Sequence, residues 1–584
     1  MVKLSLLIFL LLLGLLGSLS PLFLISSYKI VVLLAGALIF FYVSNLIHLK
    51  RSDFKLISPT LLSIFFILFL SWSAFGYLYS ADPEKSLYMT IQSLGAILLY
   101  LGLKLYIEEE SQIKSILKIL LCFGGVLAFL GVLQQFPLTI LENPIQNTAN
   151  NSTSLFVHKN VFSGYLVSLV PLFCLPFLYS FSKVWKLFSG MSFVLILIAL
   201  GFSGSRGGQL VAIFSLLIIT GYLISKNERK TAKFLVIGIF ISIVLYLIID
   251  PIAKTLQSQL NESFIDTRGS LAHLTVGWAD SPWAQRILFW QGGWEIFKDH
   301  WLIGSGPISF ALLFPKYYLN FNPIIKNQVL TSGAPPHAHN LFIQTASDSG
   351  IIGIGLMLAF LTIFYIRAYR LFKFSDREIR CTVFFVVLSI TCFLVHHMIE
   401  WNWPAPMFIY QFTFFIFTID FIYRKNFKSR KDDRPNLSGL ILPLFGVMVV
   451  LITLLSCVKY YKFNSTLYED FLSEINLQKL TSLIGSAKQY CPRCDRPHMK
   501  MALTLLERYK VNSDKNFLVL AKKELLKGQK LNPYNPEYKG YLAQIYSAEE
   551  DNGSALPLLK EALRFKRTHH IKILRLGGLF PKKN

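Results

Sequence analysis

Apolar stretches long enough to cross a lipid bilayer recur through most of the chain, and short polar connections separate them. A helix of about 20 apolar residues spans the hydrocarbon core. The pattern therefore predicts an all-α, polytopic membrane domain with about 13 transmembrane helices. The first run is longer than the apolar core of a signal peptide, so we interpret it as a retained helix. The predicted spans are 4–25, 30–47, 58–78, 86–106, 114–135, 161–180, 187–203, 208–225, 233–249, 341–366, 381–398, 404–423 and 439–458.

The hydropathy falls after the last span, and helical periodicity with polar faces follows. Ala521 and Ala555 lie 34 residues apart, as do Leu525 and Leu559, and the turn-forming segment 532–536 separates two helical patterns. This arrangement resembles tetratricopeptide repeats, in which antiparallel helix pairs stack, and an ordinary helical bundle is the alternative. We therefore predict two domains, a transmembrane domain and a soluble α-helical repeat domain, which cover 1–458 and 459–584.

The formal net charge of +24 raises the question of a nucleic-acid partner, and the positions of the basic residues argue against one. Lys and Arg are concentrated in alternate connections, such as 226–233, 367–380 and 424–434, whereas the connections between them carry few. Cytoplasmic loops of membrane proteins have such an excess. We expect a protein integral to a bacterial cytoplasmic membrane, with its N-terminus in the cytoplasm and its C-terminal domain outside.

Two cysteines stand apart from the apolar runs that contain the others. Cys491 and Cys494 form a Cys-Pro-Arg-Cys sequence in the C-terminal domain. This sequence could close a local disulfide outside the cytoplasm, supply half of a metal site, or have no role, and the sequence leaves these alternatives open.

The longest connection, 250–340, is predicted on the outer face together with 136–160 and 204–208. It contains five tryptophans and amphipathic stretches such as 287–298. Tryptophan and amphipathic helices favour the membrane interface. We therefore expect this connection to fold along the membrane surface.

The sequence Gly-Ser-Arg-Gly-Gly at 204–208 opens a helix that runs inward. Ser205 is a candidate N-cap, and Gly207 lets the backbone approach a ligand closely. Free amides at a helix N-terminus bind anions, and the Arg206 guanidinium adds bidentate hydrogen bonds to phosphate. The alternative is an arginine that extends to lipid headgroups.

His339 precedes another helix that runs inward, and Asn340 is positioned to cap it. Ala346, Gly350 and Gly353 recur at a spacing that puts them on one helix face. Small residues there allow close helix packing, which would hold the histidine rigidly. His339 is therefore a candidate for chemistry, and an interfacial histidine hydrogen-bonded to a loop is the alternative.

Arg286 lies in the 250–340 connection, ahead of a stretch rich in tryptophan and glycine. An arginine in such a connection is usually a solvated charge or the partner of a nearby carboxylate such as Asp280. Its spacing alone therefore does not assign it a function.

Over about 190–420, the chain resembles the O-antigen ligase and polymerase superfamily. The resemblance rests on three motifs in this order: the Ser-Arg-Gly turn, the arginine before the Trp- and Gly-rich stretch, and the His-Asn pair followed by two glycines. Asp348 stands where the superfamily often has glutamate. The resemblance implies a multi-helix, GT-C-like membrane glycosyltransferase that acts without metal or other cofactor on a saccharide carried by undecaprenyl diphosphate. It also implies a catalytic role for His339, diphosphate binding by Arg206 and Arg286, and supporting roles for Ser205, Gly207, Asn340, Gly350 and Gly353.

The expected chemistry is inverting transfer to an acceptor hydroxyl. Arginines and helix N-termini would stabilise the leaving diphosphate, and His339 would accept the proton of the attacking hydroxyl. The acceptor could be a glycan, a lipid or a protein, so a ligase and a polymerase both remain open. A lipid-glycan flippase is a further alternative, although transporters usually carry ionisable groups near the middle of the membrane. A non-catalytic scaffold is another, and the repeats offer a surface for a protein partner.

Overall fold

The computed structural model describes residues 27–47, 59–136, 152–156, 158–178, 181–260, 282–318, 335–427, 438–467 and 477–564. These residues form helices joined by turns and loops and contain no β-strand, so the predicted all-α fold is confirmed. Within them, 12 helices are long and apolar enough to cross a membrane. The first predicted span, 4–25, lies outside the described residues. The chain is a polytopic membrane protein.

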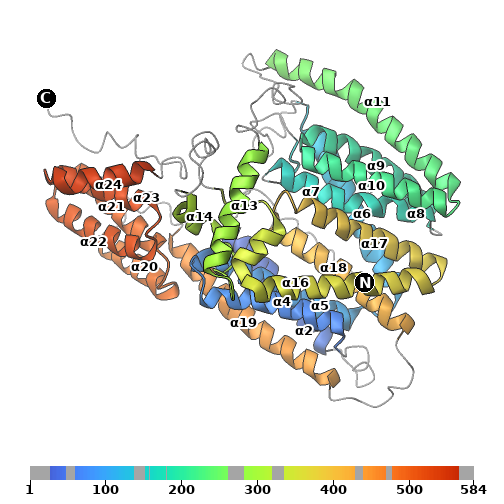
Figure 1. The fold of residues 1–584 in the computed structure, drawn as a ribbon, viewed down its shortest axis with the longest axis horizontal. Coiled ribbons are helices and arrows are strands. Elements are labelled where there is room, and N and C mark those ends of the chain that lie inside the picture. Colours follow the sequence, from blue (N-terminus) through green and yellow to red (C-terminus); the bar gives the residue numbers. More distant parts are fainter. Residues whose placement is uncertain are drawn as a thin grey trace. The chain divides into compact units, whose positions relative to one another are not determined.

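Figure 1 labels the helices in chain order. The apolar helices are α2 (Ser27–Ile47), α4 (Leu61–Phe75), α5 (Pro83–Tyr106), α6 (Glu110–Leu133), α7 (Lys159–Leu169) with η4 (Val170–Cys174) and α8 (Leu175–Leu178), α9 (Lys183–Ser203), α10 (Arg206–Ser225), α11 (Arg229–Leu260), α16 (Leu341–Phe374), α17 (Arg377–His396), α18 (Pro406–Phe427) and α19 (Ser438–Leu467). The remaining helices are η2 (Gly76–Leu78), α13 (Pro282–Asp299), α14 (Phe310–Tyr318), α20 (Leu477–Tyr490), α21 (Arg496–Asn512), α22 (Lys515–Leu531), α23 (Pro536–Ala548) and α24 (Asn552–Arg564).

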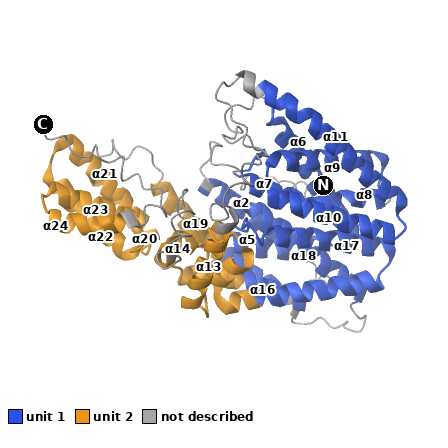
Figure 2. Cartoon of the chain, turned by 45° about the horizontal axis from the view of Figure 1, so that its top comes forward, with its two compact units in different colours: residues 1–70, 92–275, 356–451 blue, residues 71–91, 276–355, 452–584 orange. Residues whose placement is uncertain are grey.

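The chain divides into two compact units, which Figure 2 colours separately. Unit 1 contains most of the apolar helices and comprises Met1–Leu70, Gln92–Thr275 and Leu356–Leu451. Unit 2 contains α13, α14 and the C-terminal helices and comprises Ser71–Ile91, Val276–Gly355 and Ile452–Asn584.

Unit 1 is built around helices that are apolar on every side. All residues of α18 from Pro406 to Ile422 are buried, as expected for a helix surrounded by other helices. Helix α9 packs against both α6 and α11, and α10 packs against α7 and α17. Only 22% of the apolar window of α11 is buried, so most of its surface is available to lipid.

A buried ion-pair cluster joins three helices of unit 1. Asp420 of α18 is completely buried and forms an ion pair with Arg367 of α16. Its second carboxylate oxygen accepts a hydrogen bond from Tyr100 (2.8 Å) and lies 3.8 Å from Nζ of Lys104 and 3.6 Å from Nε of Arg424. Burying one charge without a partner would cost several kcal/mol, so this cluster strongly constrains how the helices pack.

Helix α16 is broken at Gly350, where the backbone has φ 64° and ψ −166°. The peptide groups around the break pair with the 301–306 segment instead of continuing the helix. Ser305 donates its backbone N–H to the carbonyl of Ser347 (2.9 Å), and Ile351 donates to the carbonyl of Trp301 (2.7 Å). The break is therefore held by hydrogen bonds from a distant part of the chain.

The prediction that Ala346, Gly350 and Gly353 share one regular helix face is wrong at Gly350, because its positive φ interrupts the helix. The expected close packing is nevertheless present. A Cβ atom on Gly350 would lie 2.4 Å from the carbonyl oxygen of Leu302, and one on Gly353 would lie 3.2 Å from the Trp72 ring.

The C-terminal helices pack as antiparallel neighbours, α21 along α22 and α23 along α24, with α22 also in contact with α23. Their core contains Ala502, Ala521, Leu525 and Tyr538. The predicted boundary at 532–536 is confirmed, since α22 ends at Leu531 and α23 begins at Pro536. These pairs agree with a tetratricopeptide-like arrangement, which stays a prediction.

Cys491 and Cys494 form a disulfide in the structure, which is one of the alternatives that the sequence leaves open.

Candidate active site

His339 lies in the loop that leads into α16. Its backbone φ of 52° is in the left-handed region, which few residues other than glycine adopt. Asn340 Oδ1 accepts the backbone N–H groups of Phe342 (2.9 Å) and Ile343 (3.1 Å), so the predicted N-cap is confirmed. The half-buried His339 ring stacks on Phe289, with 5.5 Å between ring centroids. The cap and the stacked ring together fix where the imidazole lies.

One face of α13 packs against the start of α16. Phe289 on this face contacts His339, and Gly293, about one turn further on, lies so close that an added Cβ atom would meet Ile343 at 2.5 Å. Arg286 precedes Phe289 by three residues, so it lies on the same helix face. It is half-buried. Unit 2 therefore contains the imidazole and, on an adjoining helix face, one of the two predicted arginines.

A buried amide and a buried carboxylate hold the loop that carries His339. Gln344 Oε1 accepts the backbone N–H of Ala338 (2.7 Å), and its Nε2 donates to Asp348 Oδ1 (2.9 Å). The other carboxylate oxygen of Asp348 accepts the backbone N–H of Ile308 (3.2 Å). The sequence alone indicates no partner for Asp348 and does not single out Gln344. The carboxylate thus connects the His339 loop to the 304–309 turn.

The second arginine lies in unit 1, at the first position of α10. Gly204, with φ 61°, ends α9, and Ser205 caps α10 by accepting the backbone N–H of Gly208 (3.4 Å). The tight turn and the predicted cap are confirmed. Arg206 is exposed at this helix N-terminus, with Gly207 immediately after it. Arg206 thus lies at a helix N-terminus, where free backbone amides favour anions, and its binding of a diphosphate stays a prediction.

Unit 1 also contains a buried carboxylate that is not predicted from the sequence. Glu400 lies between α17 and α18 with 5% of its surface exposed, and it accepts hydrogen bonds from Nδ2 of Asn160 (2.6 Å) and the backbone N–H of Trp401 (3.2 Å). The connection between α17 and α18 also contacts the 204–208 turn that carries Arg206, since a Cβ atom added to Gly207 would lie 2.5 Å from the Ile399 side chain. The sequence offers one signal for Glu400, a single acidic residue between two apolar runs. It does not indicate the partner, because Asn160 lies 240 positions away.

These elements define a polytopic, all-α membrane protein with a capped histidine and two arginines near helix ends. Residues 191–358 match the O-antigen ligase family model, and this segment contains Arg206, Arg286 and His339. A comparison with curated proteins gave no match. The family match supports, as a broad class, glycan transfer of the O-antigen ligase kind by a multi-pass membrane protein. Glu400 lies outside the matched segment.

Proposed function

We propose that this protein transfers a saccharide from undecaprenyl diphosphate to an acceptor hydroxyl, without a metal ion, on the outer face of the cytoplasmic membrane. The observation that carries the proposal is the position of His339: it lies at the capped start of α16, against the face of α13 that bears Arg286. Both residues fall within the segment that matches the O-antigen ligase family.

His339 acts as the general base in this proposal. Its imidazole accepts the proton of the acceptor hydroxyl while that oxygen forms a bond to the anomeric carbon. The bond from the anomeric carbon to the diphosphate oxygen breaks, and its electron pair leaves with the diphosphate. Because attack comes from the face opposite the leaving group, the anomeric configuration inverts.

Arg206 and Arg286 bind the diphosphate and stabilise the charge that develops on it. This requires that they converge with His339 in the folded protein. A guanidinium forms two parallel hydrogen bonds to a phosphate, and the N-terminus of α10 adds free amides and the positive end of a helix dipole. Charged hydrogen bonds contribute about 1.5–3 kcal/mol each, so fixed cations supply a substantial part of the stabilisation. Ser205, Gly207, Asn340, Gly350 and Gly353 support this geometry.

The direct test uses the purified protein, a lipid-linked saccharide and a candidate acceptor in the presence of EDTA. We expect the saccharide to move to the acceptor while undecaprenyl diphosphate appears in equal amount. Complete loss of transfer in EDTA, with recovery on adding a divalent cation, would contradict the metal-independent mechanism.

The same chemistry serves a ligase and a polymerase, and the products distinguish them. A ligase gives one transfer per acceptor, whereas a polymerase gives a ladder of products. Movement of the lipid-linked saccharide between membrane leaflets, with no bond broken, would instead identify a flippase. The C-terminal helices could also bind an acceptor or a protein partner.

A further inference from the structure

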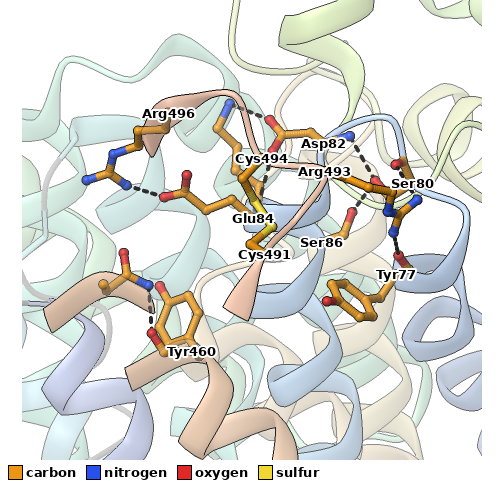
Figure 3. Close-up of a disulfide and its surroundings, with 12 residues drawn as sticks. Tyr77, Ser80, Asp82, Glu84, Ser86, Tyr460, Cys491, Arg493, Cys494 and Arg496 are labelled. Carbon is orange, nitrogen blue, oxygen red and sulfur yellow. Dashed lines mark hydrogen bonds and ion pairs between the residues drawn. A yellow bond between two sulfur atoms is a disulfide. The ribbon is translucent and has the colours of Figure 1, made fainter. Parts of the chain in front are cut away.

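The C-terminal helices contact the rest of unit 2 through a turn closed by a disulfide. Cys491 and Cys494 bracket this turn between α20 and α21, and Arg493 points out of it (Figure 3). Arg493 donates from Nη2 to the carbonyl of Tyr77 (2.8 Å) and from Nη1 to the carbonyl of Ser80 (3.4 Å). These carbonyls belong to the 76–86 segment, the connection from α4 into α5, where Glu84 also forms an ion pair with Arg496.

A second turn makes a separate contact. Tyr534, between α22 and α23, packs against a buried cluster of α13 and α14 side chains that includes Phe289 and Phe314. The two turns are joined, because the side chain of Asn532 donates to the carboxylate of Asp495 (2.9 Å). Among the described residues, these two linked turns lie at the same end of the helical domain and hold that end against the rest of unit 2.

The 76–86 segment in turn holds the 304–309 turn. Ala81 donates its backbone N–H to the carbonyl of Ser305 (3.0 Å), and Gly306 lies so close to Ser80 that an added Cβ atom would meet it at 2.4 Å. The 304–309 turn is itself bonded to α16, because the backbone N–H of Gly306 donates to the carbonyl of Asp348 (3.0 Å).

We propose that the C-terminal helical domain is a positioning element of the transfer site, with Arg493 and Tyr534 as its positioning residues. By holding the 76–86 segment and the α13–α14 cluster, it keeps the 304–309 turn against α16 and so fixes the loop that carries His339. The inference rests on the proposed function. It gives the C-terminal domain a part in catalysis that does not depend on recruiting another protein.

The test compares full-length wild-type protein with the Arg493→Ala, Arg493→Lys and Tyr534→Ala variants. Lys523→Ala is the matched control, because it removes an exposed cation from α22 of the same domain. Backbone hydrogen exchange is measured over 303–309, with 536–564 as the internal check that the helical domain stays folded. The kcat and KM for the lipid-linked saccharide are measured on the same samples.

We expect exchange over 303–309 to become on the order of 10-fold faster in Arg493→Ala and Tyr534→Ala, because charged hydrogen bonds and apolar contacts that oppose local opening are lost. We expect kcat to fall on the order of 10-fold with KM nearly unchanged, since misplaced catalytic groups slow the chemical step. Arg493→Lys should recover part of both effects, and Lys523→Ala should show neither.

Unchanged exchange over 303–309 in both alanine variants would overturn the proposal, as would faster exchange with wild-type kcat. A His339→Ala variant is measured in parallel. Wild-type transfer by that variant would overturn the proposed function and with it the kinetic part of this inference, while the exchange rates would still decide whether the helical domain holds the 304–309 turn.

Discussion

Arg286 is recognisable from sequence only in company with other motifs, because a single arginine in a long connection has many ordinary roles. The structure shows that Arg286 lies three residues before Phe289, on the face of α13 that contacts His339. Gln344 had no signal at all, since its two hydrogen bonds depend on how the loop before α16 folds back on the helix. The Asn340 cap could be predicted locally, whereas the residues that hold the His339 loop could not.

We predict that Arg286→Lys lowers transfer by at least about 10-fold, because lysine cannot form the two parallel hydrogen bonds that a guanidinium makes to phosphate. The initial rate of saccharide transfer is the measurement, with Lys298→Ala on the same helix as the control for loss of a charge. Equal rates for Arg286→Lys and wild type would mean that another group binds the diphosphate.

We predict that Gln344→Leu lowers kcat on the order of 10-fold, although leucine has a similar volume. The substitution leaves the Ala338 N–H and an Asp348 oxygen without their partner inside the protein, where each unsatisfied group costs about 1–3 kcal/mol. The loop that carries His339 should then lose its fixed position. Steady-state kinetics and hydrogen exchange over 335–340 measure both effects, and wild-type behaviour in both would show that the amide has no positioning role.

At the scale of elements, the helices follow from their own sequences, but the break in α16 does not. Asn340 and Ser205 begin helices where the sequence predicts, because a cap acts on the next few residues. Gly350 was predicted within a helix. Its conformation depends on peptide groups of the 301–306 segment, more than 40 residues earlier in the chain, so no local pattern reports it.

We predict that Gly350→Ala destabilises unit 2 by at least about 3 kcal/mol, because the alanine would combine an unfavourable φ with contacts to backbone atoms that cannot move away cheaply. Gly355→Ala is the control in the same helix, since nothing lies within 4 Å of its added Cβ atom. Thermal unfolding in detergent compares the two variants, and equal melting temperatures would contradict the account of the break.

The pH dependence of the C-terminal helices should follow Glu524. Burial alone would raise its pKa, but hydrogen bonds from His498 and Lys488 and their charges outweigh burial and hold the pKa of Glu524 at about 2. Since this is below the ordinary value of 4.5, the ionised carboxylate stabilises the folded state above about pH 4.5, and that stabilisation is lost as the pH falls towards 2.

We therefore predict that Glu524→Gln loosens α20–α22 at pH 7, by on the order of 1 kcal/mol, and that its effect becomes much smaller as the pH falls to 2, where half of the Glu524 carboxylates are protonated. Hydrogen exchange of these helices at several pH values measures the difference between variant and wild type. A difference that does not change with pH would show that the carboxylate charge is not responsible.

Along the chain as a whole, the apolar helices could be predicted, because hydropathy and periodicity are summed over many residues, whereas the division into two domains stays a prediction. The contacts of Arg493 with the 76–86 segment could not be predicted, since they join positions more than 400 residues apart. The same limit applies to the pairing of Glu400 with Asn160. The orientation of the chain in the membrane, read from the basic connections, stays a prediction.

The most direct test of the central claim is the transfer rate of purified His339→Ala protein, with lipid-linked saccharide and acceptor in EDTA. We expect the variant to insert and fold normally and to transfer at least about 100-fold more slowly than wild type, as for loss of a general base. The control is His300→Ala, which removes a histidine immediately after the C-terminal end of α13 and should transfer at the wild-type rate. A near-normal rate from correctly folded His339→Ala protein would contradict the account.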